Sequence, residues 1–131
     1  AAFTYTKSEV TDFDAVTSKS AFYPVGTTDG AEAVYVPEFQ YSISSGLHFD
    51  NCGFDTTVTF VDEMFTTGLN DTTTDAHVVV DLSAYYQVNK NTRLLGNVHN
   101  LFDEVYEAAH HPTDIRAGAP QSFYVGLEYS F

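Results

Sequence analysis

The sequence predicts an all-β fold, an antiparallel meander of about six strands without a helix. Composition is the first reason, because Phe and Tyr are abundant at 11 and 9 residues while Lys and Arg, both helix formers, total only five. The second reason is strict alternation near the C-terminus, where one face of a period-two strand carries Phe123, Val125, Leu127, Tyr129 and Phe131. Because the last residue belongs to this apolar face, something apolar must cover it.

Five further segments repeat the alternation and are the other expected strands: 3–10, 38–49, 54–65, 77–88 and 92–102. In segment 38–49 the odd positions are mostly apolar, and the even positions are Glu, Gln, Ser, Gly and His. Segment 3–10 has the weakest pattern. Asn100 interrupts the apolar face of segment 92–102, so a local bulge is expected there.

The expected connections alternate in length. Residues 50–53 and 89–91 have tight-turn compositions, whereas the connections at about 11–37, 66–75 and 103–121 are long. Short turns on one rim and long loops on the other are typical of a transmembrane β-barrel. Strands of about ten residues also suit a tilted membrane crossing.

The polar faces of the strands carry mostly Ser, Thr, Gln, Asn, Tyr and His, with few charges, which favours a hydrated barrel lumen. A soluble β-sandwich, with its apolar face inward and its polar face in water, stays open as the alternative. Aromatic residues gather at strand ends, as in the two interfacial girdles of a membrane barrel. They are Phe39, Tyr41, Phe49, Phe54, Tyr86, Phe102 and Phe131.

Charge and cysteine content exclude several classes of protein. The net charge of −13 argues against binding to nucleic acid or to anionic lipid surfaces, both of which need a basic footprint. The single cysteine, Cys52, cannot form an internal disulfide and is expected to be an inert thiol. The first residues lack the basic start and apolar run of a signal peptide. We therefore expect either a cytosolic protein or a chain whose beginning lies upstream.

The C-terminal part resembles the end of a TonB-dependent outer-membrane receptor. The matching stretches are "NVHNLFDEVYEAA" and "RAGAPQSFYVGLEYSF", with an Asn-Leu-Phe-Asp strand end at 100–103, Tyr106, and Gly118-Ala119-Pro120 before the last strand. Gln121 stands where this family usually has arginine. The looser likeness of "YVPEFQYSISSGLHFD" extends the resemblance to about residues 35–131, and the wording is most similar to siderophore and ferric-citrate type receptors.

The resemblance implies a plugged barrel of about 22 strands, of which residues 1–131 would be the C-terminal fragment, without the plug domain and the earlier strands. The whole receptor would sit in the outer membrane of a Gram-negative bacterium and import a siderophore or metal chelate with energy from TonB. This fragment would supply barrel wall, closing strand and extracellular loops, with no catalysis and no cofactor. Its partners would be lipid, the plug, TonB, the metal-chelate ligand and the barrel assembly machinery, which reads Phe131 and Tyr129.

The long loops would face outside the cell, and the third contains the strongest candidate site. His110, His111 and Asp114 are potential metal donors, and Arg116 suits a carboxylate or a chelated anion. The resemblance adds weight to His111 and Arg116. The alternative is a solvated loop in which these side chains have no ligand.

Two further groups are candidates in the other loops. Tyr23 and Tyr35 in the first loop have rings that suit an aromatic siderophore, or they pack the loop. The second loop is acidic, with Asp62, Glu63, Asp71 and Asp75, which suits calcium or cations that bridge lipopolysaccharide, or plain solvation. Acidic loops do not suit an anionic chelate. Either basic ligand contacts lie elsewhere in the receptor, or the ligand is neutral or cationic.

Four polar residues on neighbouring strands, His77, Asp81, Ser83 and His99, raise the possibility of a hydrolase site. No nucleophile elbow supports a hydrolase, so hydrogen bonding to a plug is the preferred interpretation. A small outer-membrane barrel acting as an enzyme or adhesin remains an alternative, as does a soluble β-sandwich binding module.

Overall fold

The fold was obtained as a computed structural model, which describes residues 1–11, 29–111 and 114–131. Every regular element among them is a strand, and six of the strands form one antiparallel sheet, as the sequence predicts. In sheet order they are β1 (Ala2–Tyr5), β2 (Phe39–His48), β3 (Cys52–Val61), β6 (His77–Asn89), β7 (Thr92–His99) and β10 (Ser122–Tyr129). Across the part of the chain that the structure describes, no helix is long and apolar enough to cross a membrane.

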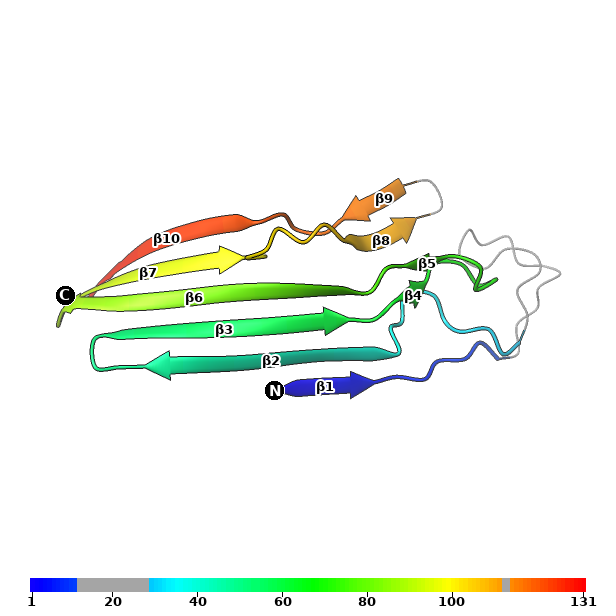
Figure 1. Ribbon diagram of the computed structural model, residues 1–131, viewed down its shortest axis with the longest axis horizontal. Coiled ribbons are helices and arrows are strands. Elements are labelled where there is room, and N and C mark those ends of the chain that lie inside the picture. The colour runs from blue at the N-terminus through cyan, green and yellow to red at the C-terminus, as the bar shows by residue number, and fades with distance from the viewer. Residues whose placement is uncertain (12–28, 112–113) are drawn as a thin grey trace.

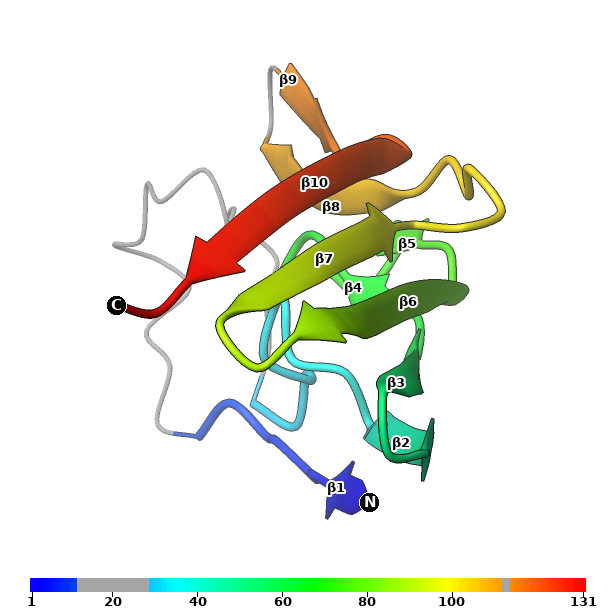
Figure 2. The same ribbon diagram turned by 90° about the vertical axis from the view of Figure 1, so that its left-hand side faces the viewer.

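The short turns and the long loops lie at opposite ends of the sheet. The β2–β3 turn, the β6–β7 turn and the C-terminus share one end, and the long connections extend from the other (Figure 1). Seen from the short-turn end, the strands follow an arc and do not form a flat layer (Figure 2). This is the arrangement expected for part of a barrel wall.

The register puts apolar residues opposite apolar residues, which confirms the predicted faces. Ile43, Val58 and Val80 form one row across three strands, and Tyr41 lies opposite Phe60 with ring centroids 4.9 Å apart. On the other face Ser44 lies opposite Thr57, and Asp55 lies opposite Ser83.

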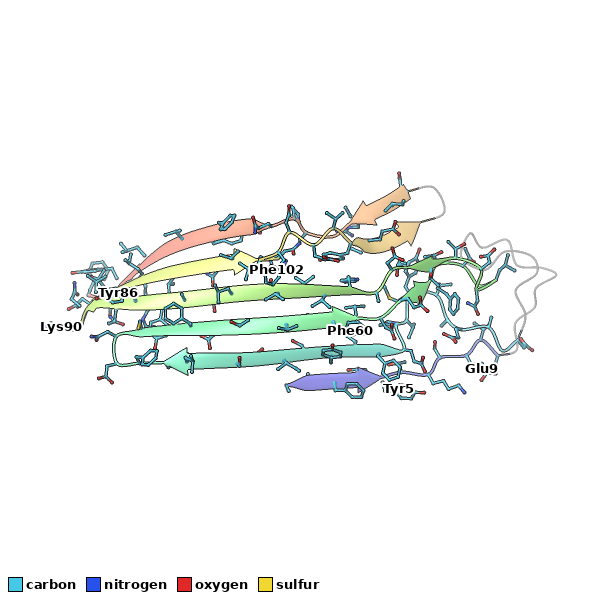
Figure 3. The ribbon with its side chains drawn as sticks, viewed as in Figure 1. Tyr5, Glu9, Phe60, Tyr86, Lys90 and Phe102 are labelled. Atoms are coloured by element: carbon cyan, nitrogen blue, oxygen red, sulfur yellow. The ribbon has the colours of Figure 1, made fainter. Side chains whose placement is uncertain are left out.

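The apolar face is exposed. Val125 is 90% exposed and Leu127 67%, and among the described apolar residues only Val79, at 8%, counts as buried. A soluble β-sandwich needs such a face packed against a second sheet, and the described residues provide none. The aromatic residues of this face lie toward both ends of the strands, with Tyr86 near the short turns and Tyr5 and Phe60 nearer the loops (Figure 3).

Two small hairpins in the long loops were not predicted. The second loop contains β4 (Met64–Phe65) paired with β5 (Thr73–Thr74), and the third contains β8 (Glu107–His111) paired with β9 (Asp114–Ala117). The expected strand 54–65 consequently ends at Val61, where the Asp62 carboxylate accepts a hydrogen bond from the Glu63 amide. The expected strand 3–10 is shorter than its pattern, since β1 ends at Tyr5.

The expected bulge at Asn100 is wrong. Strand β7 ends at His99, and its pairing with β10 is regular up to that residue. Asn100 has a φ of 51°, in the left-handed region, so the backbone turns out of the strand. The irregular pairing of β7 lies instead on its other side, in the β6–β7 hairpin, between Gln87 and Asn89 beside the short turn.

Candidate functional site

Asn100 is the center of a buried junction at the loop end of the sheet. Its side chain, in a residue only 1% exposed, donates to the carbonyls of Glu104 (2.9 Å) and Ala119 (3.0 Å) and accepts from the Glu104 amide (2.8 Å). Its own amide donates to the Asp81 carboxylate at 2.9 Å. These bonds tie the end of β7 both to β6 and to the segment that leads into β10.

Gln121 completes this junction from the other side. Its side-chain amide donates to the Leu101 carbonyl at 2.7 Å, and its backbone amide donates to the Asp103 carboxylate at 3.0 Å. The glutamine that departs from the resembled pattern therefore still connects the Asn-Leu-Phe-Asp strand end to the start of the last strand.

Tyr106 lies beside the junction, between two elements. Its ring is stacked on His77 of β6, with centroids 4.2 Å apart and planes 15° apart. On its other side Gly118 leaves room for the ring, because a Cβ atom there would overlap it. The Gly118 amide also donates to the Tyr106 carbonyl at 2.7 Å. Tyr106 and Gly118 belong to the resembled motif, but no role for them can be predicted from the sequence beyond the signal of a glycine before the last strand.

The third-loop candidates meet in the β8–β9 hairpin. The register places His111 opposite Asp114, His110 opposite Ile115 and Ala109 opposite Arg116. Asp114 and Arg116 are exposed. The predicted ligand residues of this loop therefore share one element, and their role stays a prediction.

A cavity of about 490 Å³ lies between this hairpin and the rim of the sheet. His77 and Tyr106 line it, together with three carboxylate residues, Asp75, Glu104 and Glu107. Ile115 and Ala117 of β9 also line it, and no Lys or Arg does. A chemical group that enters this cavity meets aromatic rings and negative charge.

The first loop packs against the second. The Tyr35 amide donates to the Phe65 carbonyl at 2.9 Å, and the Asn70 side chain bonds both the amide of Glu32 (2.8 Å) and its carbonyl (3.2 Å). Tyr35 and Asn70 both have positive φ, 59° and 54°. The structure thus places Tyr35 at the contact between two loops, whereas Tyr23 lies outside the described residues.

The acidic residues of the second loop do not gather into one cluster in the described structure. Across the side chains that the structure describes, those of residues 1–11, 29–109 and 114–131, no three from His, Cys, Asp and Glu gather closely enough to hold a metal ion. Asp71 is instead bonded within its loop, by the hydroxyls of Thr67 (2.6 Å) and Thr72 (3.2 Å). The Thr67 hydrogen bond, partly opposed by desolvation and aided by Thr72, lowers the pKa of Asp71 below its ordinary value.

We expect the pKa of Asp71 to lie below that of an ordinary aspartate. Because the folded pKa is lowered, its contribution to loop stability is present above the ordinary value and is lost as pH falls through the folded pKa. Thr67→Val should raise the NMR titration midpoint of Asp71, and the matched change Thr72→Val should raise it less. A larger effect from Thr72→Val would contradict this assignment.

The polar face of the sheet is lined by cross-strand pairs. The hydroxyls of Ser44 and Thr57 lie 2.9 Å apart, and His99 Nδ1 lies 2.6 Å from an Asp81 carboxylate oxygen. A depression of about 370 Å³ includes Asp81, Ser83 and His99. His77 stacks on Tyr106 away from it, and among the described hydrogen bonds none joins Ser83 to His99. The four residues therefore do not form the arrangement that a hydrolase would need.

The chain belongs to a known family of membrane receptors. The family model for the TonB dependent receptor-like β-barrel matches residues 1–101, most of the chain. The match ends at Leu101, so the C-terminal motif that carries the resemblance in the sequence lies almost wholly beyond it. Members of this family and the solved structures similar to this chain are transport receptors and not enzymes.

Several solved structures share the fold. The ferric preacinetobactin receptor BauA of Acinetobacter baumannii has a TM-score of 0.79 at 21% identity, over 98% of this chain and 19% of its own. The closed form of the ferric-catecholate import receptor Fiu of E. coli K12 has a TM-score of 0.77 at 21% identity, and the match covers 98% of this chain and 18% of Fiu. The ferripyoverdine receptor of the Pseudomonas aeruginosa outer membrane has a TM-score of 0.69 at 19% identity, and the match covers 78% of this chain and 15% of that receptor. This chain thus spans less than a fifth of each of these receptors.

Proposed function

We propose that this chain forms part of the wall of an outer-membrane receptor that imports a siderophore or another metal chelate with energy from TonB. The observation that carries the proposal is the family match over residues 1–101. A curved six-stranded sheet with loops gathered at one end supports it. So do the names of the similar receptors, which include ferric preacinetobactin and ferripyoverdine receptors.

The sheet itself supports a role as a segment of a longer barrel. Strands β1 and β10 each have only one neighbour in this sheet, so two edges offer unpaired backbone groups. In the proposed receptor, strands from elsewhere in a longer chain would pair with these edges and lipid would cover the exposed apolar face. The polar face would then line the lumen, where its hydroxyl, His and Asp groups face a plug domain.

The C-terminal residues fit the proposed assembly signal. Phe131 is fully exposed, and the ring of Tyr129 lies 5.1 Å from it in a T-shaped contact. The preceding Ser130 is bonded to Asn91, through its amide (2.9 Å) and its carbonyl (2.6 Å). The backbone is thus held while the terminal ring stays available to the assembly machinery or to lipid.

The charges around the third-loop cavity indicate which charge the proposed ligand would have. The cavity between the β8–β9 hairpin and the sheet has three carboxylate residues and neither Lys nor Arg in its lining, so the part of a chelate that approaches it would be neutral or cationic. Arg116, exposed on the hairpin, is the candidate contact for a carboxylate or phenolate oxygen. Tyr23, Tyr35, His110, His111 and Asp114 are the other proposed ligand residues.

Iron uptake by the full-length receptor tests this function. Cells that carry or lack the gene would be given radiolabelled ferric iron as a catecholate, a hydroxamate or a citrate chelate. We expect the gene to raise accumulation of at least one chelate, and deletion of TonB to abolish the gain. Equal accumulation with and without the gene for all three classes would contradict uptake of ferric chelates.

A further inference from the structure

We propose that Tyr106 is a positioning residue, which fixes the β8–β9 hairpin over the rim of the sheet and so sets the geometry of the third-loop ligand residues. The hairpin joins the sheet through the segments that precede β8 and follow β9, and β8 also lies close to β5. Tyr106 lies immediately before β8, and Gly118 lies immediately after β9.

The contacts of Tyr106 involve both strands of the hairpin, at the start of β8 and at the end of β9. Its ring stacks on His77, at the first position of β6, and His77 is only 9% exposed and thus a firm support. Its carbonyl accepts the Gly118 amide at 2.7 Å, which closes the base of the hairpin. Because the ring also occupies the space beside Gly118, the start of β8 and the end of β9 are both held against β6.

The hydrogen bonds of Asn100 do not act on the hairpin directly. The Asn100 junction holds Glu104 and Ala119, which lie outside the hairpin, and the pairing inside it is irregular between Glu107 and Ala109. An irregular, short, two-stranded hairpin is marginally stable alone. Without the ring, the β8–β9 hairpin would stay close to β5 but lose the stacking on β6. The hairpin would therefore open or shift at its base, and the cavity between Tyr106, Ile115 and Ala117 would lose its shape.

Proteolysis of the full-length receptor in outer-membrane vesicles tests the positioning without any ligand. Trypsin cleaves after Arg116, which lies in β9, and cleavage requires the paired strand to open. Tyr106→Ala should speed appearance of the new terminus at Ala117 by about tenfold. Tyr106→Phe, which keeps the ring, should restore the wild-type rate.

Two further variants make the test specific. Gly118→Ala places a Cβ atom in the space of the ring and should also speed cleavage, although it removes no side chain. Tyr86→Ala is the matched control, the same substitution at the short-turn end, and should leave the rate at Arg116 unchanged. Wild-type rates in both Tyr106→Ala and Gly118→Ala, at normal receptor levels, would overturn the proposal.

The consequence for ligand rests on the proposed function and is measured separately. With the ferric chelate that supports uptake, Tyr106→Ala should raise the half-saturating concentration while the maximal rate per receptor stays near wild type, and Tyr106→Phe should bind normally. Faster proteolysis with unchanged half-saturation would overturn the link to ligand and leave the mechanical role standing. Failure to find any transported chelate would count against the function and not against the proteolysis result.

Discussion

Replacing Asn100 with alanine should destabilise the folded receptor by about 4 kcal/mol. The substitution removes three buried hydrogen bonds, to the amide and carbonyl of Glu104 and to the carbonyl of Ala119. Each is worth about 1 kcal/mol. Alanine at a φ of 51° costs about 1 kcal/mol more. Urea unfolding of the full-length receptor in detergent, followed by the loss of heat-resistant migration in gels, would measure the change.

Asn100→Gly separates the two causes. Glycine adopts positive φ without a steric penalty, so this variant should lose the hydrogen bonds but not the backbone term, and should be about 1 kcal/mol more stable than Asn100→Ala. Asn100→Asp keeps the acceptor for the Glu104 amide but loses both donors, and it adds a charge beside Asp81. A urea midpoint equal to that of the wild type for Asn100→Ala would mean that the hydrogen bonds of Asn100 contribute little to the stability of the receptor.

The strands could be predicted because both of their determinants are local. Side chains alternate with a period of two, so the faces of β2, β3, β6 and β10 follow from the sequence alone. The turn compositions at 50–53 and 89–91 also give the two short hairpins directly. Once a face is set by one strand, the register of its neighbour follows, since a slip of one residue would bring polar residues onto the apolar face.

The loop rim could not be predicted, because its contacts are non-local. Two-residue strands such as β4 and β5 are too short to have a period, and the stacking of Tyr106 on His77 joins separate segments. The bulge expected at Asn100 shows why. A polar residue on an apolar face suggested a bulge, but its buried side chain bonds Ala119, which no local pattern reveals. The candidate residues His110, His111, Asp114 and Arg116 lie close together in the sequence, but their pairing in a hairpin could not be predicted from it.

Val58→Arg tests which face of the sheet meets lipid. Val58 lies near the middle of β3, between Ile43 and Val80 on the apolar face. An arginine that faces lipid near the bilayer midplane costs about 2–4 kcal/mol. We therefore expect the full-length variant to fold less completely into lipid vesicles, as measured by the urea midpoint of folding.

The neighbouring substitution Thr57→Arg is the matched control. Thr57 points to the other face, where it lies opposite Asp81 and lines the same depression as Asp55. A new guanidinium there meets hydrated carboxylates in place of lipid, so its cost should stay below about 1 kcal/mol. Equal costs for the two arginines would contradict the assignment of faces, and a larger cost for Thr57→Arg would reverse it. Because the two positions are adjacent in one strand, depth in the membrane and local backbone are the same, and only the face differs.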